Sequence, residues 1–86
     1  MATAAYVLIE TEVGKADDVI ASLRKIKGVK CAHFITGPYD AICEIEVEDL
    51  VDLNAIIGQT IHLIAGIKKT VSCIVMDSPS LMESSL

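Results

Sequence analysis

One short segment of the sequence groups several residues that could bind a small polar ligand, the turn Thr36-Gly37-Pro38-Tyr39-Asp40. A free amino acid needs hydrogen-bond donors for its carboxylate and an acceptor for its ammonium group. Backbone N–H groups near Gly37 could be the donors, Asp40 the acceptor, and Tyr39 a wall of the site. Asp40 could equally do no more than stabilise its own turn. The residues themselves leave both interpretations open.

The three cysteines, Cys31, Cys43 and Cys73, do not have the spacing of a metal or nucleophile site. Cys31 and His33 form a C-x-H pair, but zinc needs three or four ligands. The other candidates, Cys43, His62 and Cys73, belong to other predicted elements, and we expect them mostly to face the helices. A reactive thiol also needs a neighbouring base or a positive environment. We therefore predict structural thiols in a reducing compartment, with no metal, no cofactor and no catalytic residue.

The charge pattern excludes several classes of partner. The formal net charge is −5, and the seven Lys and Arg residues form no basic stripe, so we expect no direct binding to nucleic acid. In the acidic run 44–49, Asp49 is placed to cap a helix, which we favour over a cation site. No apolar stretch approaches the ~18–20 residues that span a bilayer, and residues 1–5 lack a signal-peptide pattern. We expect a cytoplasmic protein without membrane contact.

Alternation of apolar and polar residues predicts four strands, and a period of 3.6 predicts two helices. The predicted strands are 5–11, 29–36, 40–47 and 67–76, and the predicted helices are 15–27 and a segment that follows Asp49 and ends at Gly66. Gly58 interrupts the second helix, and we expect it to pack closely against the sheet. Residues 77–86 are rich in Ser, and this composition predicts a flexible tail. Residues 1–76 would then form a single domain.

The predicted order of elements is β-α-β-β-α-β, and each helix ends at a glycine followed by a β-branched residue, in Gly28-Val29 and Gly66-Ile67. This duplication predicts a ferredoxin-like α+β fold. Right-handed crossovers would place both helices on one face of a four-stranded antiparallel sheet.

The other face of that sheet is mixed in character. By alternation it would carry Tyr6, Leu8, Glu10, Ile42, Glu44, Thr70, Ser72, Ile74 and Met76. This set contains too many apolar side chains for a surface exposed to water and too many polar side chains for an ordinary core. We therefore expect two sheets to pack face to face in a homodimer.

The chain as a whole resembles the effector-binding (RAM) domain of the Lrp/AsnC family of regulators, from Ala5 to about Met76. The resemblance lies in Thr36-Gly37-x-Tyr39-Asp40, in the acidic helix start Glu48-Asp49-Leu50, and in Gly66-Ile67-x-x-Thr70-x-Ser72-x-Ile74-Val75. It implies a domain that dimerises through its sheet, assembles into larger rings such as octamers, and binds free amino acids near the turn between the second and third strands.

Carried over by position, the resemblance implies ligand contacts at Gly37, Tyr39 and Asp40, with Thr70 and Ser72 as weaker candidates on a neighbouring strand. Only residues 1–4 precede the first predicted strand, so the chain resembles the stand-alone form without a DNA-binding helix-turn-helix. Such a form could act by joining or modulating full-length regulators of the family. Pro38 stiffens a position that varies in the family, so ligand preference is not carried over.

Two other functions share the predicted topology. One is a dimeric α+β-barrel enzyme, such as a small monooxygenase or isomerase. Its cavity would have to be built from Tyr6, Glu10 and Glu44, since the chain has two Tyr, one Phe and no Trp. The other is a purely structural oligomer that binds no ligand.

Overall fold

The computed structural model describes residues 2–76, so the predicted tail at 77–86 lies outside the described residues. The elements follow each other in the predicted order, and the second helix continues from α2 through a π-helical turn (η1) and a 3-10 turn (η2). They are β1 (Thr3–Thr11), α1 (Ala16–Arg24), β2 (Val29–Phe34), β3 (Ala41–Val47), α2 (Leu50–Ala55), η1 (Ile56–Thr60), η2 (Ile61–Leu63) and β4 (Ile67–Ile74). Among the helices of residues 2–76, none has the length and apolar content to cross a membrane.

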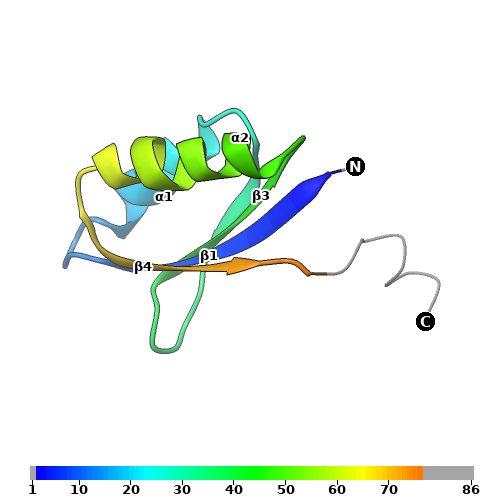
Figure 1. Ribbon diagram of the computed structural model, residues 1–86. Helices are drawn as coiled ribbons and strands as arrows, with labels where there is room; N and C mark the ends of the chain where they lie inside the picture. The colour runs from blue at the N-terminus through cyan, green and yellow to red at the C-terminus, as the bar shows by residue number, and fades with distance from the viewer. Residues whose placement is uncertain (1, 77–86) are drawn as a thin grey trace.

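The four strands form one antiparallel sheet in the order β2-β3-β1-β4. Both helices lie on the same face of this sheet, and no described element covers the other face (Figure 1). The ferredoxin-like α+β fold predicted from the sequence is confirmed.

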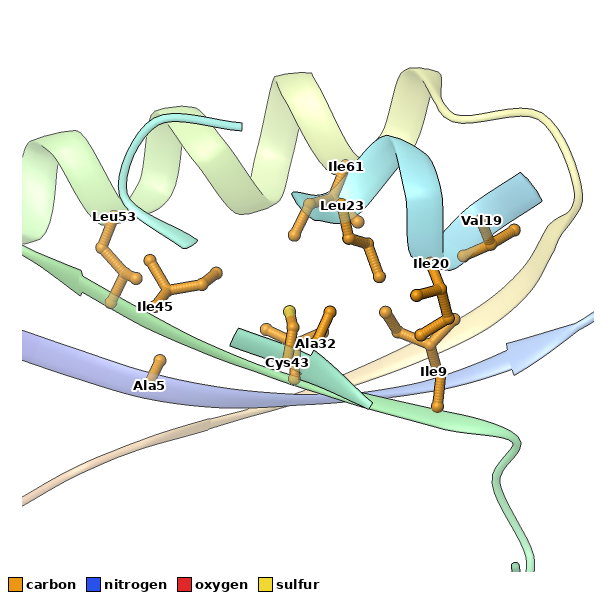
Figure 2. Packing of buried hydrophobic residues seen from close by; sticks show 12 residues of the cluster. Ala5, Ile9, Val19, Ile20, Leu23, Ala32, Cys43, Ile45, Leu53 and Ile61 are labelled. Atoms are coloured by element: carbon orange, nitrogen blue, oxygen red, sulfur yellow. The ribbon is translucent and has the colours of Figure 1, made fainter. Parts of the chain in front are cut away.

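The core lies between the helices and the sheet. The predicted apolar face of α1 supplies Val19, Ile20 and Leu23, all of them buried. Leu53 of α2 and Ile61 of η2 approach from the second helical segment, and these side chains reach toward the sheet (Figure 2). The sheet's contribution to this core is Ala5, Val7, Ile9, Ala32, Ala41, Cys43 and Ile45. Apart from the Cys43 thiol, aliphatic side chains fill this layer, and among the described residues it holds no buried polar or charged side chain.

The second helix begins where the sequence predicts and differs from the prediction in its middle. Asp49 accepts a hydrogen bond from the N–H of Asp52 at 3.0 Å, which confirms the predicted cap. The expectation that Gly58 packs against the sheet is wrong: Gly58 is exposed, and a Cβ built on it would meet nothing within 4 Å. Gly58 lies in the π-helical turn, none of whose residues is fully buried.

On the two central strands, the open face of the sheet carries the predicted residues. Tyr6 and Leu8 of β1 pair with Glu44 and Ile42 of β3. They alternate along each strand with residues that are buried beneath the helices. Glu10 continues the same face toward the end of β1.

On β4 the predicted face is wrong by one residue. Thr70 and Ser72 pair with Ile9 and Val7, whose side chains are fully buried in the core. Directly opposite residues of an antiparallel pair share a face, so Thr70, Ser72 and Ile74 lie on the helix side. Both alternating sets of β4 mix polar with apolar residues. Hydrophobic pattern therefore could not fix its phase, and pairing with β1 did.

The open face of β4 instead carries Lys69, Val71 and Cys73, which pair with Glu10, Leu8 and Tyr6. Cys73 is exposed, so the expectation that it faces the helices is also wrong. Met76 lies beyond the end of β4 and is 92% exposed. The open face therefore contains an exposed thiol that the sequence pattern assigned to the other side.

Candidate functional site

The turn between β2 and β3 is closed at its base and open at its tip. The N–H of Ile35 donates to the carbonyl of Asp40 at 3.0 Å, and the N–H of Asp40 donates to the carbonyl of Ile9 at 2.9 Å. Gly37 has φ +141, a conformation that L side chains rarely adopt, and nothing lies within 4 Å of a Cβ placed there. Figure 1 shows this loop projecting away from the helices. The tip is therefore free to meet another molecule.

Asp40 anchors the end of β1. Its Oδ2 accepts hydrogen bonds from the backbone N–H of Thr11 at 2.9 Å and from the Thr11 hydroxyl at 3.3 Å. Within the described residues no hydrogen bond reaches Oδ1, and the side chain is half-buried. The carboxylate thus has a structural role at β1 rather than in its own turn, and it keeps one oxygen that could accept from an ammonium group.

A single copy of the chain does not bring the five candidate residues into one pocket. Thr70 pairs with Ile9, the same residue that binds the Asp40 N–H from the other side, so β1 separates Thr70 from Asp40. Two strand spacings amount to about 10 Å. Ser72 lies further along β4, opposite Val7. Gly37, Tyr39 and Asp40 form one group, and Thr70 and Ser72 form another.

Sequence reasoning missed two residues that shape these surfaces. Thr11 holds Asp40 from 29 positions away, and no local pattern marks that pairing. Lys30 places its Nζ 3.9 Å from Glu44 and 3.5 Å from Glu46, both on the open face. Lys30 therefore lies beside two carboxylates of the acidic run 44–49, which supports the interpretation of that run as solvated surface.

A cleft of about 710 Å³ lies at the opposite end of the sheet from the turn. It is lined by Lys27, Gly28, Glu46, Glu48, Asp52 and Ile56, among others, and by none of the five candidate residues. Its rim carries acidic groups and one lysine, and it is broadly open to solvent. The geometry therefore offers two separate places for a ligand, the turn and this cleft.

The cysteines differ sharply in their surroundings. Cys31 and His33 both lie on the open face, as their spacing predicts, and the Cys31 thiol lies 3.9 Å from Glu44 Oε1. Within residues 2–76, no three or more His, Cys, Asp and Glu side chains are grouped to hold a metal. Cys43 is buried under the helices, and loss of hydration there, together with the neighbouring Cys31, raises the pKa of its thiol from 9.0 to about 11.

At about pH 8, an alkylating reagent such as iodoacetamide should modify Cys73 readily and leave Cys43 intact, because reaction needs an accessible thiolate. Peptide mass spectrometry would locate the adducts, and the urea-unfolded protein is the control in which Cys43 must react. Labelling of Cys43 in the native protein at the rate of Cys73 would contradict its burial.

The raised pKa of Cys43 also makes the free energy of unfolding depend on pH. Its contribution to stability is complete below about pH 9 and is lost as pH rises to about 11.

Comparison with known proteins gives a match along almost the whole chain. The family model of the Lrp/AsnC ligand binding domain matches residues 4–84. A curated relative from Pyrococcus horikoshii, described as an uncharacterised HTH-type transcriptional regulator, PH0140, is 30% identical over 66 residues. These residues are 77% of this chain and 42% of the relative, so the chain spans less than half the length of that protein.

Solved structures show the same fold. The hypothetical protein PHS023 from Pyrococcus horikoshii is 32% identical, with a TM-score of 0.82 over 92% of this chain and 94% of that one. A transcriptional regulator from Neisseria meningitidis, NMB0573, solved in complex with L-Met, is 19% identical, with a TM-score of 0.78 over 90% of this chain and 51% of that one. At 19% identity the likeness establishes the fold alone.

Proposed function

Because this chain belongs to the family of Lrp/AsnC ligand-binding domains, we propose that it is a regulatory domain that binds a free amino acid, works as an oligomer and catalyses no reaction. The observation that carries the proposal is the family match over residues 4–84. The apolar core is consistent with it, because no polar or charged side chain of the described residues is buried there.

The open face of the sheet supports the oligomer. Tyr6, Leu8, Ile42 and Val71 form a continuous apolar centre on three adjacent strands. Side chains of this kind on an uncovered sheet gain free energy when a second surface removes them from water. A second copy of the chain brings an identical apolar centre, so we propose a homodimer that joins these faces, with higher assembly of such dimers.

The ligand would bind at the turn that contains Gly37, Tyr39 and Asp40. The free Oδ1 of Asp40 could accept from the ammonium group, and backbone N–H groups of the open tip could donate to the carboxylate. The turn is too exposed to enclose a ligand alone. Thr70 and Ser72 would therefore complete the pocket from a neighbouring copy, so that binding and assembly are coupled.

An amino acid that binds this site should raise the melting temperature. At 100 times its dissociation constant a ligand adds about 2.7 kcal/mol, which for a small domain amounts to roughly 10 °C or more. The test is a thermal-shift screen over the twenty amino acids, L-Met included. The Asp40→Asn variant, which keeps an oxygen for Thr11 and loses the charge, should melt near the wild type and lose the ligand-induced rise.

Glu48→Gln is the matched control, because it makes the same change of group in the cleft at the other end of the sheet. It should keep the full ligand-induced rise. Loss of the rise in Glu48→Gln with retention in Asp40→Asn would move the site to the cleft. No rise with any amino acid would leave a purely structural oligomer.

The physiological partner would be a full-length regulator of the same family. The P. horikoshii relative is described as an HTH-type regulator, and this chain spans only 42% of it. We propose that the chain forms mixed assemblies with such regulators in the cytoplasm and shifts their response to the amino acid. Co-purification that yields self-assembly only would count against this partner.

A further inference from the structure

Four residues form a straight row across the open face of the sheet, one from each strand. Cys31 of β2 pairs with Glu44 of β3, Glu44 pairs with Tyr6 of β1, and Tyr6 pairs with Cys73 of β4. The row therefore reads thiol, carboxylate, phenol, thiol from one edge to the other. Its two halves are complementary, since a carboxylate accepts the hydrogen bond that a phenol donates.

Glu44 is the member of the row that a dimer must accommodate. Its side chain is only 28% exposed even in the single copy, and its nearest cation, Lys30 Nζ, lies 3.9 Å away on a side chain that is 53% exposed. Covering the face would remove the remaining water from the carboxylate. The Cys31 thiol is a weak donor that reaches this carboxylate only at 3.9 Å. A carboxylate deprived of water needs a stronger donor in its place, which the packing of two sheets would have to bring to Glu44.

The direction of the twofold axis decides which residue faces Glu44. An axis perpendicular to the strands keeps the strand order and reverses the position along each strand. When the axis passes at the level of Glu44, it sets Glu44 against the partner's Glu44. When the axis is moved by one residue along the strands, Glu44 faces the partner's Ile42. Neither supplies a donor. An axis parallel to the strands reverses the strand order and keeps the position of each residue along its strand. We place this axis between β1 and β3, at the middle of the sheet. It sets Glu44 against the partner's Tyr6.

We infer that two copies pack face to face about an axis parallel to the strands, so that each Glu44 carboxylate accepts a hydrogen bond from the Tyr6 hydroxyl of the partner. This inference rests on the proposed function in assuming that the open face joins two copies. Two residues further along the strands, Ile42 and Leu8 of one copy meet Leu8 and Ile42 of the other. The carboxylates are thereby satisfied in pairs within an otherwise apolar interface.

The ends of the row provide a direct test of this arrangement. In the inferred dimer Cys31 lies across from Cys73 of the partner, once at each edge. Face-to-face sheets lie about 10 Å apart, which exceeds the roughly 4.4–6.8 Å between the Cα atoms of a disulfide. A bifunctional reagent is therefore needed. Within one copy the two cysteines lie three strand spacings apart, about 14 Å, so a short bismaleimide would join copies.

Sedimentation equilibrium of the full chain should first give the mass of a dimer or a larger assembly. A short bismaleimide should then produce a covalent dimer from the wild type. Cys31→Ser and Cys73→Ser alone should each give less than a tenth of that product, because each removes one end of both links. A mixture of the two variants should regain a cross-link in mixed dimers.

The outcomes separate the inferred register from the dimer itself. A monomeric mass overturns both. A dimeric mass with a covalent dimer persisting in Cys73→Ser shows Cys31 facing Cys31, which overturns the register and retains the dimer. A dimeric mass with no cross-link in the wild type also overturns the register.

The hydrogen bond has its own test. Glu44→Gln and Tyr6→Phe should each raise the dissociation constant of the dimer at least tenfold, because a hydrogen bond to a charged group contributes about 1.5–3 kcal/mol. The double variant should be little weaker than the more affected single variant, since the same contact is lost. Effects that multiply in the double variant would show that the two side chains do not meet.

Discussion

Replacement of Leu23 by alanine should lower the free energy of unfolding by about 2–5 kcal/mol, the range found when a buried leucine leaves a cavity. Leu23 lies on the inner face of α1 and is fully buried. Figure 2 shows it above the sheet beside Ile61 of the second helical segment, with Ala32 and Cys43 beneath. Small side chains in the sheet cannot move to fill the space. A domain this size has few other contacts to offset such a loss.

Urea unfolding, followed by circular dichroism, would measure the change. All variants must be compared at one concentration, because an oligomer gains apparent stability as concentration rises. Leu63→Ala is the matched control: it deletes the same atoms at a residue that is 85% exposed, and should change the free energy by less than about 0.5 kcal/mol. Equal effects of the two variants would contradict the assignment of Leu23 to the core.

Gly66→Ala should destabilise the protein by about 2–5 kcal/mol, for two separate reasons. Gly66 has φ +95, which costs an L residue about 1–2 kcal/mol. A Cβ there would also lie 2.8 Å from Lys15 Cβ and 3.2 Å from Val19 Cγ2. Those atoms belong to the start of α1, and overpacking against a fixed element costs about 1–3 kcal/mol. Thermal or urea unfolding would measure the sum.

Two other glycines separate the two causes. Gly14 has φ +80 with nothing within 4 Å of a Cβ, so Gly14→Ala should show the backbone cost alone. Gly58 has neither a positive φ nor a close neighbour, so Gly58→Ala should stabilise the helix by about 0.5–1 kcal/mol. A loss in Gly14→Ala as large as in Gly66→Ala would show that contact with α1 contributes nothing.

The fold could be predicted from the sequence because its signals are local and repeat. The apolar period of α1 and the strict alternation of β3 each agree with the burial that the structure shows. Glycine followed by a β-branched residue marks the return from each helix to the sheet. These patterns depend on 3.6 and 2 residues per repeat, so they establish the type of each element before any element has a neighbour.

The candidate site was less predictable because its contacts are distant in sequence. The turn could be located from Gly37 and Pro38, but the role of Asp40 depends on Thr11, which belongs to another strand. The face of Thr70 and Ser72 depended on the register between β4 and β1, which shifts between residues 10 and 11. Neither the Asp40–Thr11 contact nor the register between β4 and β1 can be inferred from the local alternation of apolar and polar residues.

The sequence by itself determined which segments are strands and helices, which side of the central strands is buried, and which family the chain resembles. Those properties follow from side-chain hydrophobicity and backbone preferences within a few residues. Only the tertiary structure decided which face of β4 is open, where the Asp40 carboxylate is held, and that Cys31, Glu44, Tyr6 and Cys73 form one row. Those properties arise when hydrogen bonds fix the register between strands, and register is a relation between segments far apart in the chain.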